Sequence, residues 1–356
     1  MSPTETTGRF SRLPDDEAIA AGLRAPTEPR PEPRPGVYVQ LYRGAYRDMP
    51  GAPKRDQLLR HVDQLAGLGL PGVVFHGFPE EILAAWDSLA KAAADRGLLA
   101  LASWGLDSKG MSAQRKGVLV GDLLARRSCA AGLLDAEGQW DSDLGPADDM
   151  DEAGAVALCD EIARRAPGAW VGDQPWYAID SHGGVRKTAK REREGGVFAG
   201  FPVDEFAKVC TWGRFRQAYI YNHLGPAQGY AATFARMDRE WGIVNPALER
   251  AGLGRPLRVT LQGYRWKLHE LVDALLTRHV APAAPLVMWA EPFPDAVALR
   301  ALRVVLKLQR EGMAKVGCDA RETIRKVQRE LNTRGHSLDV DGWCGDATAA
   351  ALGLST

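Results

Sequence analysis

The sequence predicts an α/β fold: a (β/α)8 barrel followed by a small α-helical C-terminal domain. Short apolar segments typical of buried parallel strands alternate with amphipathic segments typical of helices, over about 280 residues. The chain of 356 residues is too long for one small domain and suits a barrel with an appendage. An open doubly wound sheet also alternates strands and helices, but no glycine-rich phosphate loop follows the first predicted strand.

Eight segments have the apolar character and the length of strands in a parallel sheet that is covered on both faces. The predicted strands are Val37–Tyr42, Gly72–His76, Leu98–Trp104, Ala131–Glu137, Ala169–Pro175, Gln217–Asn222, Leu257–Gly263 and Leu286–Glu291. Amphipathic segments between them are expected as helices, and these are Gln57–Leu68, Glu80–Arg96, Asp151–Arg165, Tyr230–Arg250, Lys267–Val280 and Ala296–Glu311. A barrel of this kind would hold its functional residues at the carboxyl ends of the strands.

The chain divides into three parts. Residues 1–35 are polar and then proline-rich with alternating charge, which indicates an extended spacer. Residues 36–315 form the predicted barrel, and residues 316–356 form the C-terminal domain. Within the barrel, the basic segment Gly184–Gly196 is expected to be a mobile, solvated loop. A substrate lid or a contact to anionic polymers is the alternative for that segment.

The composition argues against several classes of function. Lys and Arg together number 45, as do Asp and Glu, so no excess of basic residues points to nucleic acid or to an anionic membrane. No apolar run is long enough to span a bilayer, so we expect no membrane insertion. The 5 cysteines form neither a disulfide framework nor a Cys-x-x-Cys metal site. We expect no cofactor.

Polar and aromatic residues gather where the predicted strands end. Carboxylates can supply acid and base chemistry, and the faces of Trp and Tyr rings can stack on pyranose rings. The strand ends therefore predict a site for a sugar chain. The residues expected to contact the sugar are Trp104, Trp140, Trp176, Tyr221, Gln262, Tyr264 and Trp289. One or two of the four tryptophans are expected to be core residues instead.

Asp135 and Glu137 form the central pair of carboxylates. Residues i and i+2 of a strand point to the same face, with Cα atoms roughly 6–7 Å apart, so both side chains would face the barrel mouth. Glycoside hydrolysis needs two such groups, one as acid and one as base or nucleophile. Burial beside aromatic walls would raise the pKa of Glu137 and make it the proton donor, while Asp135 or Asp173 stays ionised. Glu291 is a further candidate on the eighth strand.

Each of these acids has a structural alternative. Asp135 and Glu137 could cap a loop or form salt bridges, since an Asp-x-Glu sequence is common by itself. Asp173 and Glu291 could each form an ion pair with a nearby arginine such as Arg43 or Arg265. His76 and His223 could be zinc ligands of an amidase or peptidase, but the chain lacks a His-Glu-x-x-His spacing. No metal site is therefore predicted.

The C-terminal segment reads as two short helices joined by a turn. Apolar residues recur at helical spacing over Ile324–Leu331, and Gly335 stands where a left-handed residue would end that helix. Asp341-Gly342 is a turn signal, and Thr348 begins a second helix of small residues. Two short helices make a poor core alone. The segment is therefore expected to lean on the larger domain or on a Cys318–Cys344 bond.

This segment resembles the small peptidoglycan-binding repeat found at the ends of many bacterial and phage cell-wall hydrolases. The matched residues are Val327-Gln328, Leu331-Asn332, Gly335, Leu338-x-Val340-Asp341-Gly342, the aromatic Trp343, Gly345-x-x-Thr348 and an alanine-rich helix. The resemblance implies that the segment binds peptidoglycan, with Asp341 and Trp343 as wall-binding residues. The alternative is a helical cap for the barrel.

The barrel resembles the lysozyme-type muramidases of glycoside hydrolase family twenty-five and related glycoside-hydrolase-like barrels. That family places an Asp-x-Glu at the end of its fourth strand, with the Glu as general acid, which implies an active site at Asp135 and Glu137. Glu291 would fall near the place of a further family acid. The family's first strand carries an Asp, and the segment Tyr38–Tyr42 has none.

The first hypothesis is a muramidase-like hydrolase whose partner is the glycan strand of peptidoglycan. The second is a catalytically inactive glycan-binding barrel of a phage-like or secreted particle, which the missing first-strand acid favours. A zinc amidase is the third. Residues 1–16 are polar and carry no hydrophobic signal region. We therefore expect a protein made in the cytoplasm without a signal peptide. It would act at the bacterial cell wall after lysis, packaging or export by a secretion apparatus.

Overall fold

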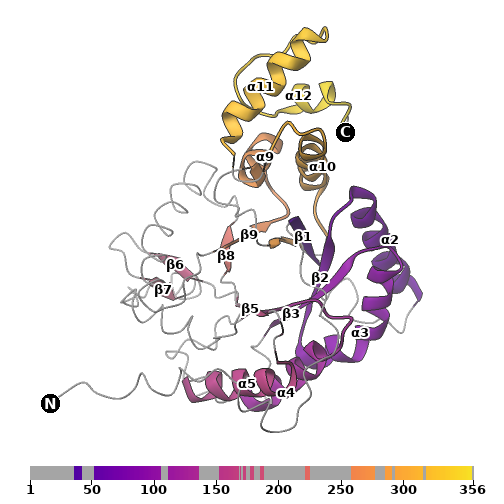
Figure 1. The fold of residues 1–356 in the computed structure, drawn as a ribbon, viewed down its shortest axis with the longest axis vertical. Coiled ribbons are helices and arrows are strands. Elements are labelled where there is room, and N and C mark those ends of the chain that lie inside the picture. Colours follow the sequence, from indigo (N-terminus) through magenta and orange to yellow (C-terminus); the bar gives the residue numbers. More distant parts are fainter. Residues whose placement is uncertain are drawn as a thin grey trace, which may run out of the picture.

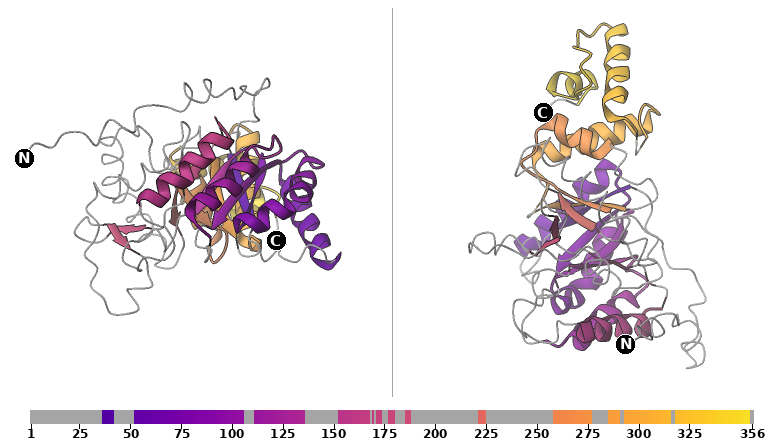
Figure 2. Two further views of the ribbon diagram at one scale, coloured as in Figure 1. Left: turned by 90° about the horizontal axis from the view of Figure 1, so that it is seen from below. Right: turned by 90° about the vertical axis from the view of Figure 1, so that its left-hand side faces the viewer.

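The structure is a computed structural model. It describes residues 36–41, 52–105, 111–135, 152–167, 169, 171–173, 177–179, 185–187, 221–224, 258–276, 285–290, 293–315 and 318–354. Within these residues, parallel strands form the centre, helices lie on their outer side, and the C-terminal helices lie at one end (Figure 1, Figure 2).

One parallel sheet contains the strands β1 Gly36–Leu41, β2 Gly72–Gly77, β3 Leu99–Gly105, β4 Gly132–Asp135, β5 Val171–Asp173, β8 Tyr221–Leu224, β9 Arg258–Gln262 and β10 Pro285–Ala290. Their order is β5-β4-β3-β2-β1-β10-β9-β8, so the first strand pairs with the last. This order confirms the α/β barrel, because a doubly wound sheet does not bring its first and last strands together. Each of the eight predicted strand segments overlaps one of these strands.

Eight helices are described: α2 Ala52–Leu68, α3 Pro79–Ala94, α4 Ala113–Leu124, α5 Glu152–Arg165, α9 Leu268–Leu276, α10 Ala296–Arg310, α11 Ala320–Thr333 and α12 Asp346–Ala351. The predicted helix Tyr230–Arg250 lies outside the described residues, and the sequence pattern does not predict α4. A short antiparallel pair, β6 Tyr177–Ile179 and β7 Val185–Lys187, places a strand in part of the predicted loop. Among the helices described, none has the length and apolar character needed to cross a membrane.

Alternate residues along the strands belong to two different apolar clusters. The cluster inside the barrel contains Tyr38, Val74, Leu101, Leu133 and Val287. The cluster between the sheet and the helices takes residues of the opposite alternation, including Val39, Phe75, Ala102, Leu134 and Met288. This is the period of two that a strand imposes on its side chains. Because paired residues in a parallel register share a face, the register assigns each position to the inner or the outer side.

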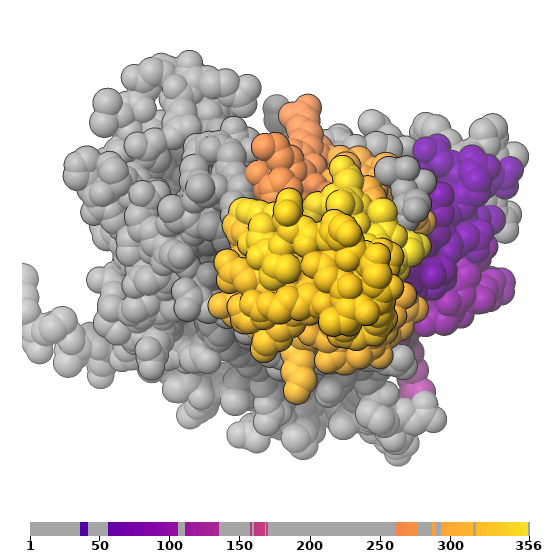
Figure 3. Space-filling model, turned by 90° about the horizontal axis from the view of Figure 1, so that it is seen from above, coloured from indigo at the N-terminus to yellow at the C-terminus, as the bar shows by residue number. Residues whose placement is uncertain are grey.

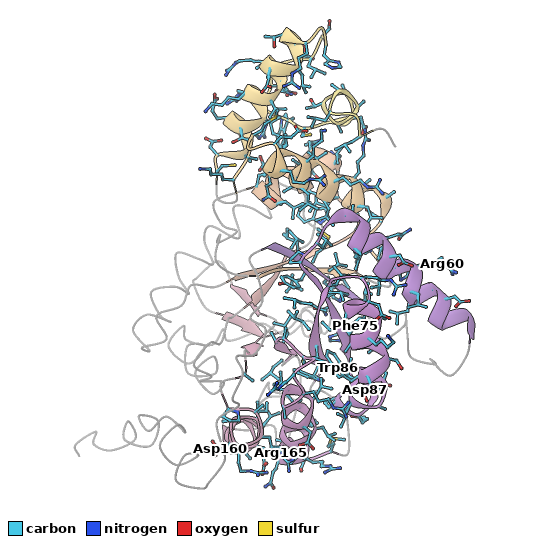
Figure 4. All side chains as sticks on the ribbon, turned by 45° about the vertical axis from the view of Figure 1, so that its right-hand side comes forward. Arg60, Phe75, Trp86, Asp87, Asp160 and Arg165 are labelled. Carbon is cyan, nitrogen blue, oxygen red and sulfur yellow. The ribbon has the colours of Figure 1, made fainter. Side chains whose placement is uncertain are left out.

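The outer cluster joins sheet and helices through large aromatic contacts. Phe75 on β2 meets Trp86 on α3 edge to face, with ring centroids 6.3 Å apart (Figure 4). Trp86 is fully buried, and its Nε1 donates to Ser128 Oγ at 2.9 Å. At the surface, Arg126 pairs with Asp87 at 2.6 Å, but exposed ion pairs of this kind contribute little to stability. Apolar burial is therefore the main force that holds α3 on the sheet.

Two glycines let α4 pack closely against α5. A Cβ at Gly117 would lie 2.5 Å from the carbonyl oxygen of Leu158, and one at Gly121 would lie 2.9 Å from Arg165 Cβ. Glycine also lowers the helix propensity of the segment, which explains why its sequence pattern does not predict a helix. The sequence signal for this helix is Ser112, the N-cap residue, whose side chain accepts a hydrogen bond in the first turn of α4.

The C-terminal segment packs on α9 and α10, and in the view from above it lies over part of them (Figure 3). Arg300 on α10 donates from Nε to the carbonyl oxygen of Leu354 at 2.9 Å and forms an ion pair with Asp346. Arg321 on α11 reaches Asp273 on α9 at 3.3 Å. The apolar residues of α11 belong to the same buried cluster as those of α9 and α10. The segment therefore leans on the larger domain.

A Cys318–Cys344 bond does not support the segment, because both cysteines are free thiols. Burial raises the pKa of the Cys344 thiol to about 12. Cys318 Sγ lies 3.6 Å from the carbonyl oxygen of Leu276 and donates to it.

Candidate functional site at the carboxyl ends of the strands

Asp135 is the last residue of β4, and Asp173 is the last residue of β5. The two strands are neighbours, so both acids stand at the carboxyl edge of the sheet, where a barrel holds its active site. The register pairs Asp173 with Leu134, a residue of the outer cluster. Asp135 follows the alternation of Leu133, a residue of the inner cluster. Of the two acids, the backbone thus gives Asp135 the position that belongs to the barrel interior.

A group of buried polar side chains lies on the inner face of the first three strands. His76 on β2 and Ser103 on β3 are register partners, and His76 Nδ1 lies 3.0 Å from Ser103 Oγ in a hydrogen bond. Gln40 on β1 is 2% exposed, and its Oε1 has no hydrogen-bond partner. Sequence reasoning missed Gln40 and Ser103 and considered His76 only as a zinc ligand. Within the described part of the chain, no cluster of three or more His, Cys, Asp or Glu could hold a metal ion.

Two of the predicted aromatic residues come together at the ends of β9 and β10. Tyr264 and Trp289 are half-buried, and their ring centroids are 5.4 Å apart with the planes tilted by 47°. Trp289 is the register partner of both Gln40 and Gln262. The pair therefore adjoins the buried polar group on β1.

The turn after β9 is held in place by Asp295, the N-cap of α10. Its carboxylate accepts hydrogen bonds from Arg265 N at 2.9 Å and from Ala298 N at 2.8 Å. Asp295 N donates to the carbonyl oxygen of Gly263 at 3.0 Å. Arg265 has a φ of 65°, unusual for a residue with a side chain, and its guanidinium Cζ is 5.7 Å from the centre of the Tyr264 ring. These contacts fix the backbone beside the aromatic pair.

Trp104 belongs to the core and not to the mouth of the barrel. Its side chain is fully buried in the outer cluster between β3 and the helices. Gly132 on β4 provides the space, because a Cβ there would lie 2.3 Å from the Trp104 ring. Ser103, one residue earlier, takes the inner face instead. The structure thus supports the core alternative for this tryptophan.

The remaining predicted site residues are described in part or not at all. The strand positions of Asp135, Asp173, Tyr221 and Gln262 are given by the backbone alone. Tyr221 is the register partner of Arg258 on β9. The residues outside the described ranges are Glu137, Trp140, Trp176 and Glu291.

In the C-terminal segment, the buried side chain of Gln328 connects α11 to the turn. Gln328 Nε2 donates to Asp341 Oδ1 at 2.8 Å and to the carbonyl oxygen of Trp343 at 3.0 Å. Gln328 Oε1 accepts from Gly342 N at 3.0 Å. Asp341 Oδ1 also accepts from Trp343 N at 2.8 Å, and these hydrogen bonds lower the pKa of the Asp341 carboxyl. Asp341 therefore holds the turn, although its side chain remains exposed.

Trp343 faces the barrel side of the segment. The guanidinium of Arg321 lies over its ring, and the His269 ring meets it edge to face, with centroids 4.7 Å apart. Arg321 also reaches Asp273, a buried residue that is 8% exposed. Burial raises the pKa of Asp273 to about 6, while the charge of Arg321 opposes that rise. Trp343 is therefore part of the junction with α9.

The chain matches no protein-family model and no curated protein sequence. Among solved structures, it is similar to a type I 3-dehydroquinate dehydratase from Clostridium difficile, with 11% identity and a TM-score of 0.45 over 80% of this chain and 95% of that one. A GH5_18 protein from Streptomyces cattleya in complex with GlcNAc is 14% identical, with a TM-score of 0.49 over 79% of this chain and 81% of that one. The PgaB (BpsB) glycoside hydrolase domain from Bordetella bronchiseptica is 12% identical, with a TM-score of 0.43 over 76% of this chain and 99% of that one. Likenesses this distant decide neither a reaction nor a substrate, and the barrel assignment stands on the strand order.

Proposed function

We propose that this protein is a muramidase-like glycoside hydrolase that cuts peptidoglycan and is anchored to the cell wall by its C-terminal repeat. The observation that carries the proposal is the end of β4. Asp135 closes that strand at the carboxyl edge of the barrel, and Glu137 follows two residues later. Two carboxylates at this edge are what glycoside hydrolysis needs.

In the proposed reaction, Glu137 donates a proton to the leaving glycosidic oxygen. Asp135 stays ionised and stabilises the positive charge that develops on the sugar ring, or attacks it as the nucleophile. Water then supplies the hydroxyl group that ends on the sugar, and its proton returns to Glu137. Asp173 at the end of β5 and Glu291 just after β10 are the other candidates for the second carboxylate. The register of Asp173 with Leu134 favours Asp135 over Asp173 in this role.

The aromatic residues support a carbohydrate ligand. Tyr264 and Trp289 offer partly exposed rings beside the strand ends, and such rings stack on the apolar faces of pyranoses. We propose that Trp140 and Trp176 extend this surface along the glycan strand. The strand residues Tyr221 and Gln262 are proposed to bind its hydroxyl groups.

The C-terminal segment supports peptidoglycan as the polymer. The residues that carry its resemblance to the wall-binding repeat include Gln328 and Asp341, whose hydrogen bond fixes the turn. The turn presents the exposed carboxylate of Asp341, while Trp343 packs at the junction with α9. We propose that this surface contacts the wall, and that the protein acts there on glycan strands.

The test is the release of new reducing ends from purified peptidoglycan, together with loss of turbidity. Wild type is compared with Glu137→Gln and with Glu80→Gln, which makes the same chemical change at an exposed acid in the first turn of α3. We expect release by wild type and by Glu80→Gln, and none by Glu137→Gln, which should still pellet with the wall. Lytic activity that survives in Glu137→Gln would remove Glu137 from the role of acid.

One observation favours a second candidate function, a catalytically inactive glycan-binding barrel of a phage-like or secreted particle. β1 carries Gln40 and no acid, whereas the muramidases that the barrel resembles have an Asp on the first strand. In the same assay, this function predicts that wild type pellets with the wall and releases no reducing ends.

A further inference from the structure

The turn between β9 and α9 carries two exposed cations on either side of a buried anchor. Arg265 and Lys267 are exposed, whereas Trp266 between them is 5% exposed and belongs to the outer apolar cluster. Because Trp266 points into the core, its two neighbours in the turn face solvent. The turn follows the end of β9, at the carboxyl edge of the barrel where the candidate site lies.

Two carboxylates at this turn accept hydrogen bonds from backbone N–H groups. Asp295 accepts from Arg265 N at 2.9 Å and from Ala298 N at 2.8 Å. Glu270 Oε2 accepts from Lys267 N at 3.2 Å. Within the part of the chain that the structure describes, neither the Arg265 guanidinium nor the Lys267 ammonium forms an ion pair. The two acids thus hold the backbone, and both cationic groups are available to a ligand.

The position of Arg265 brings its charge to the aromatic pair. Among the described residues, it is the only one other than glycine with a positive φ, at 65°. This conformation is unfavourable for a residue with a Cβ, and residues held in it gather at binding and catalytic sites. Its guanidinium Cζ is 5.7 Å from the centre of the Tyr264 ring, which packs against Trp289. The charge therefore lies beside the rings that are proposed to bind the sugar.

We propose that Arg265 and Lys267 bind a carboxylate carried by the sugar chain, an inference that rests on the proposed glycan-acting function and assigns two specificity residues to it. The planar guanidinium can donate two parallel hydrogen bonds to a carboxylate, and the ammonium adds a second positive charge. A sugar stacked on Tyr264 and Trp289 would place its substituent near these cations. In peptidoglycan, the carboxylate comes either from a muramic acid without a peptide or from the stem peptide.

The double variant Arg265→Gln/Lys267→Gln removes both charges and keeps two polar side chains. Its affinity for a carboxylate-bearing oligosaccharide should fall about tenfold, because two charge-assisted contacts are lost. Its affinity for a neutral oligosaccharide should stay unchanged. The melting temperature should also stay within about 1 °C of wild type, because exposed side chains contribute little to stability. The wild-type preference for the acidic ligand should shrink as the salt concentration rises, because exposed charges are screened.

The experiment is titration calorimetry on the full chain with three tetrasaccharides. The first is the neutral tetramer of N-acetylglucosamine. The second alternates N-acetylglucosamine with N-acetylmuramic acid and carries free lactyl carboxylates. The third is the same tetrasaccharide with stem peptides attached. The matched control is Arg303→Gln/Arg310→Gln, which makes the same change of net charge at two exposed arginines of α10.

We expect wild type and the control variant to bind at least one acidic tetrasaccharide about tenfold more tightly than the neutral one. Whichever of the two is preferred identifies the source of the carboxylate. We expect Arg265→Gln/Lys267→Gln to bind all three with similar affinity.

The outcomes that overturn the inference differ from those that overturn the proposed function. If wild type binds the neutral and acidic tetrasaccharides equally, no carboxylate is recognised, and the glycan-acting function stands. If the double variant keeps the preference, or the control variant loses it as well, Arg265 and Lys267 are not the specificity residues. If wild type binds none of the three and does not pellet with peptidoglycan, the proposed function and this inference fall together.

Discussion

Replacing Gln328 by Met would separate the turn of the C-terminal segment from α11. Gln328 is 1% exposed, and its side chain makes three close hydrogen bonds, to Asp341, to the carbonyl oxygen of Trp343 and from Gly342 N. Methionine keeps the volume, so the loss is almost entirely one of polar contacts.

The expected loss of stability follows from these bonds. At about 1 kcal/mol for each of the three close hydrogen bonds, the segment loses about 3 kcal/mol. Gly342 N is buried and would be left without an acceptor, which brings the upper end to about 5 kcal/mol. A loss of 3 kcal/mol corresponds to a population of the open segment about 100 times larger.

Hydrogen exchange followed by mass spectrometry measures this opening directly. Amides of residues 320–354 should exchange about 100-fold faster in Gln328→Met, while those of β1 to β3 keep the wild-type rate. Gln114→Met serves as the control, because an exposed amide should change stability by less than about 0.5 kcal/mol. Exchange of the C-terminal amides that stays within roughly threefold of wild type would show that Gln328 does not hold the turn.

Two other perturbations test the core and the junction. Gly132→Ala should destabilise the fold by about 1–3 kcal/mol, since its Cβ would lie 2.3 Å from the buried Trp104 ring. Gly67→Ala in α2, with nothing within 4 Å of its Cβ, should be neutral or stabilise by up to about 1 kcal/mol. Denaturant unfolding compares the two, and equal losses would contradict the packing at β4. The second perturbation concerns pH, because burial raises the pKa of Asp273 to about 6. Between about pH 4 and that value the folded state keeps a proton that the unfolded chain has lost, so stability falls as pH rises through this window. Asp273→Asn should flatten the change of melting temperature with pH, and an unchanged slope would exclude Asp273 as its source.

The strands and the barrel could be predicted because the signal is local. A buried strand flanked by amphipathic helices is visible as a run of apolar residues, and eight such runs suffice to suggest closure. A shift of one residue along a strand exchanges the inner and outer faces of the sheet. A segment that is apolar throughout does not reveal which of its residues face inward. Trp104 and Ser103 are adjacent, and the absence of a side chain at Gly132 is what gives the outer face to the tryptophan.

The buried polar residues of the candidate site were harder to find for the same reason. Gln40 is a single amide in the run Val37–Leu41, and its importance depends on having no partner, which only the packing reveals. The docking of the C-terminal segment depends on contacts between distant residues, such as Arg300 with Leu354. Sequence patterns of helical period give the helices of this segment but not the surface on which they rest.

The contacts of Arg300 and Arg321 attach the C-terminal segment rigidly to the barrel, unlike a flexible linker. A flexible linker would let an anchor and a barrel mouth move independently, with an effective concentration set by the length of the linker. Here α11 and α12 are bonded to α9 and α10, so a segment that binds the wall as proposed would keep a fixed offset from the mouth of the barrel. A protein held to a polymer in this way reaches only the few bonds at that offset. Its rate of detachment, and not its chemistry, would then set how much of the polymer it visits.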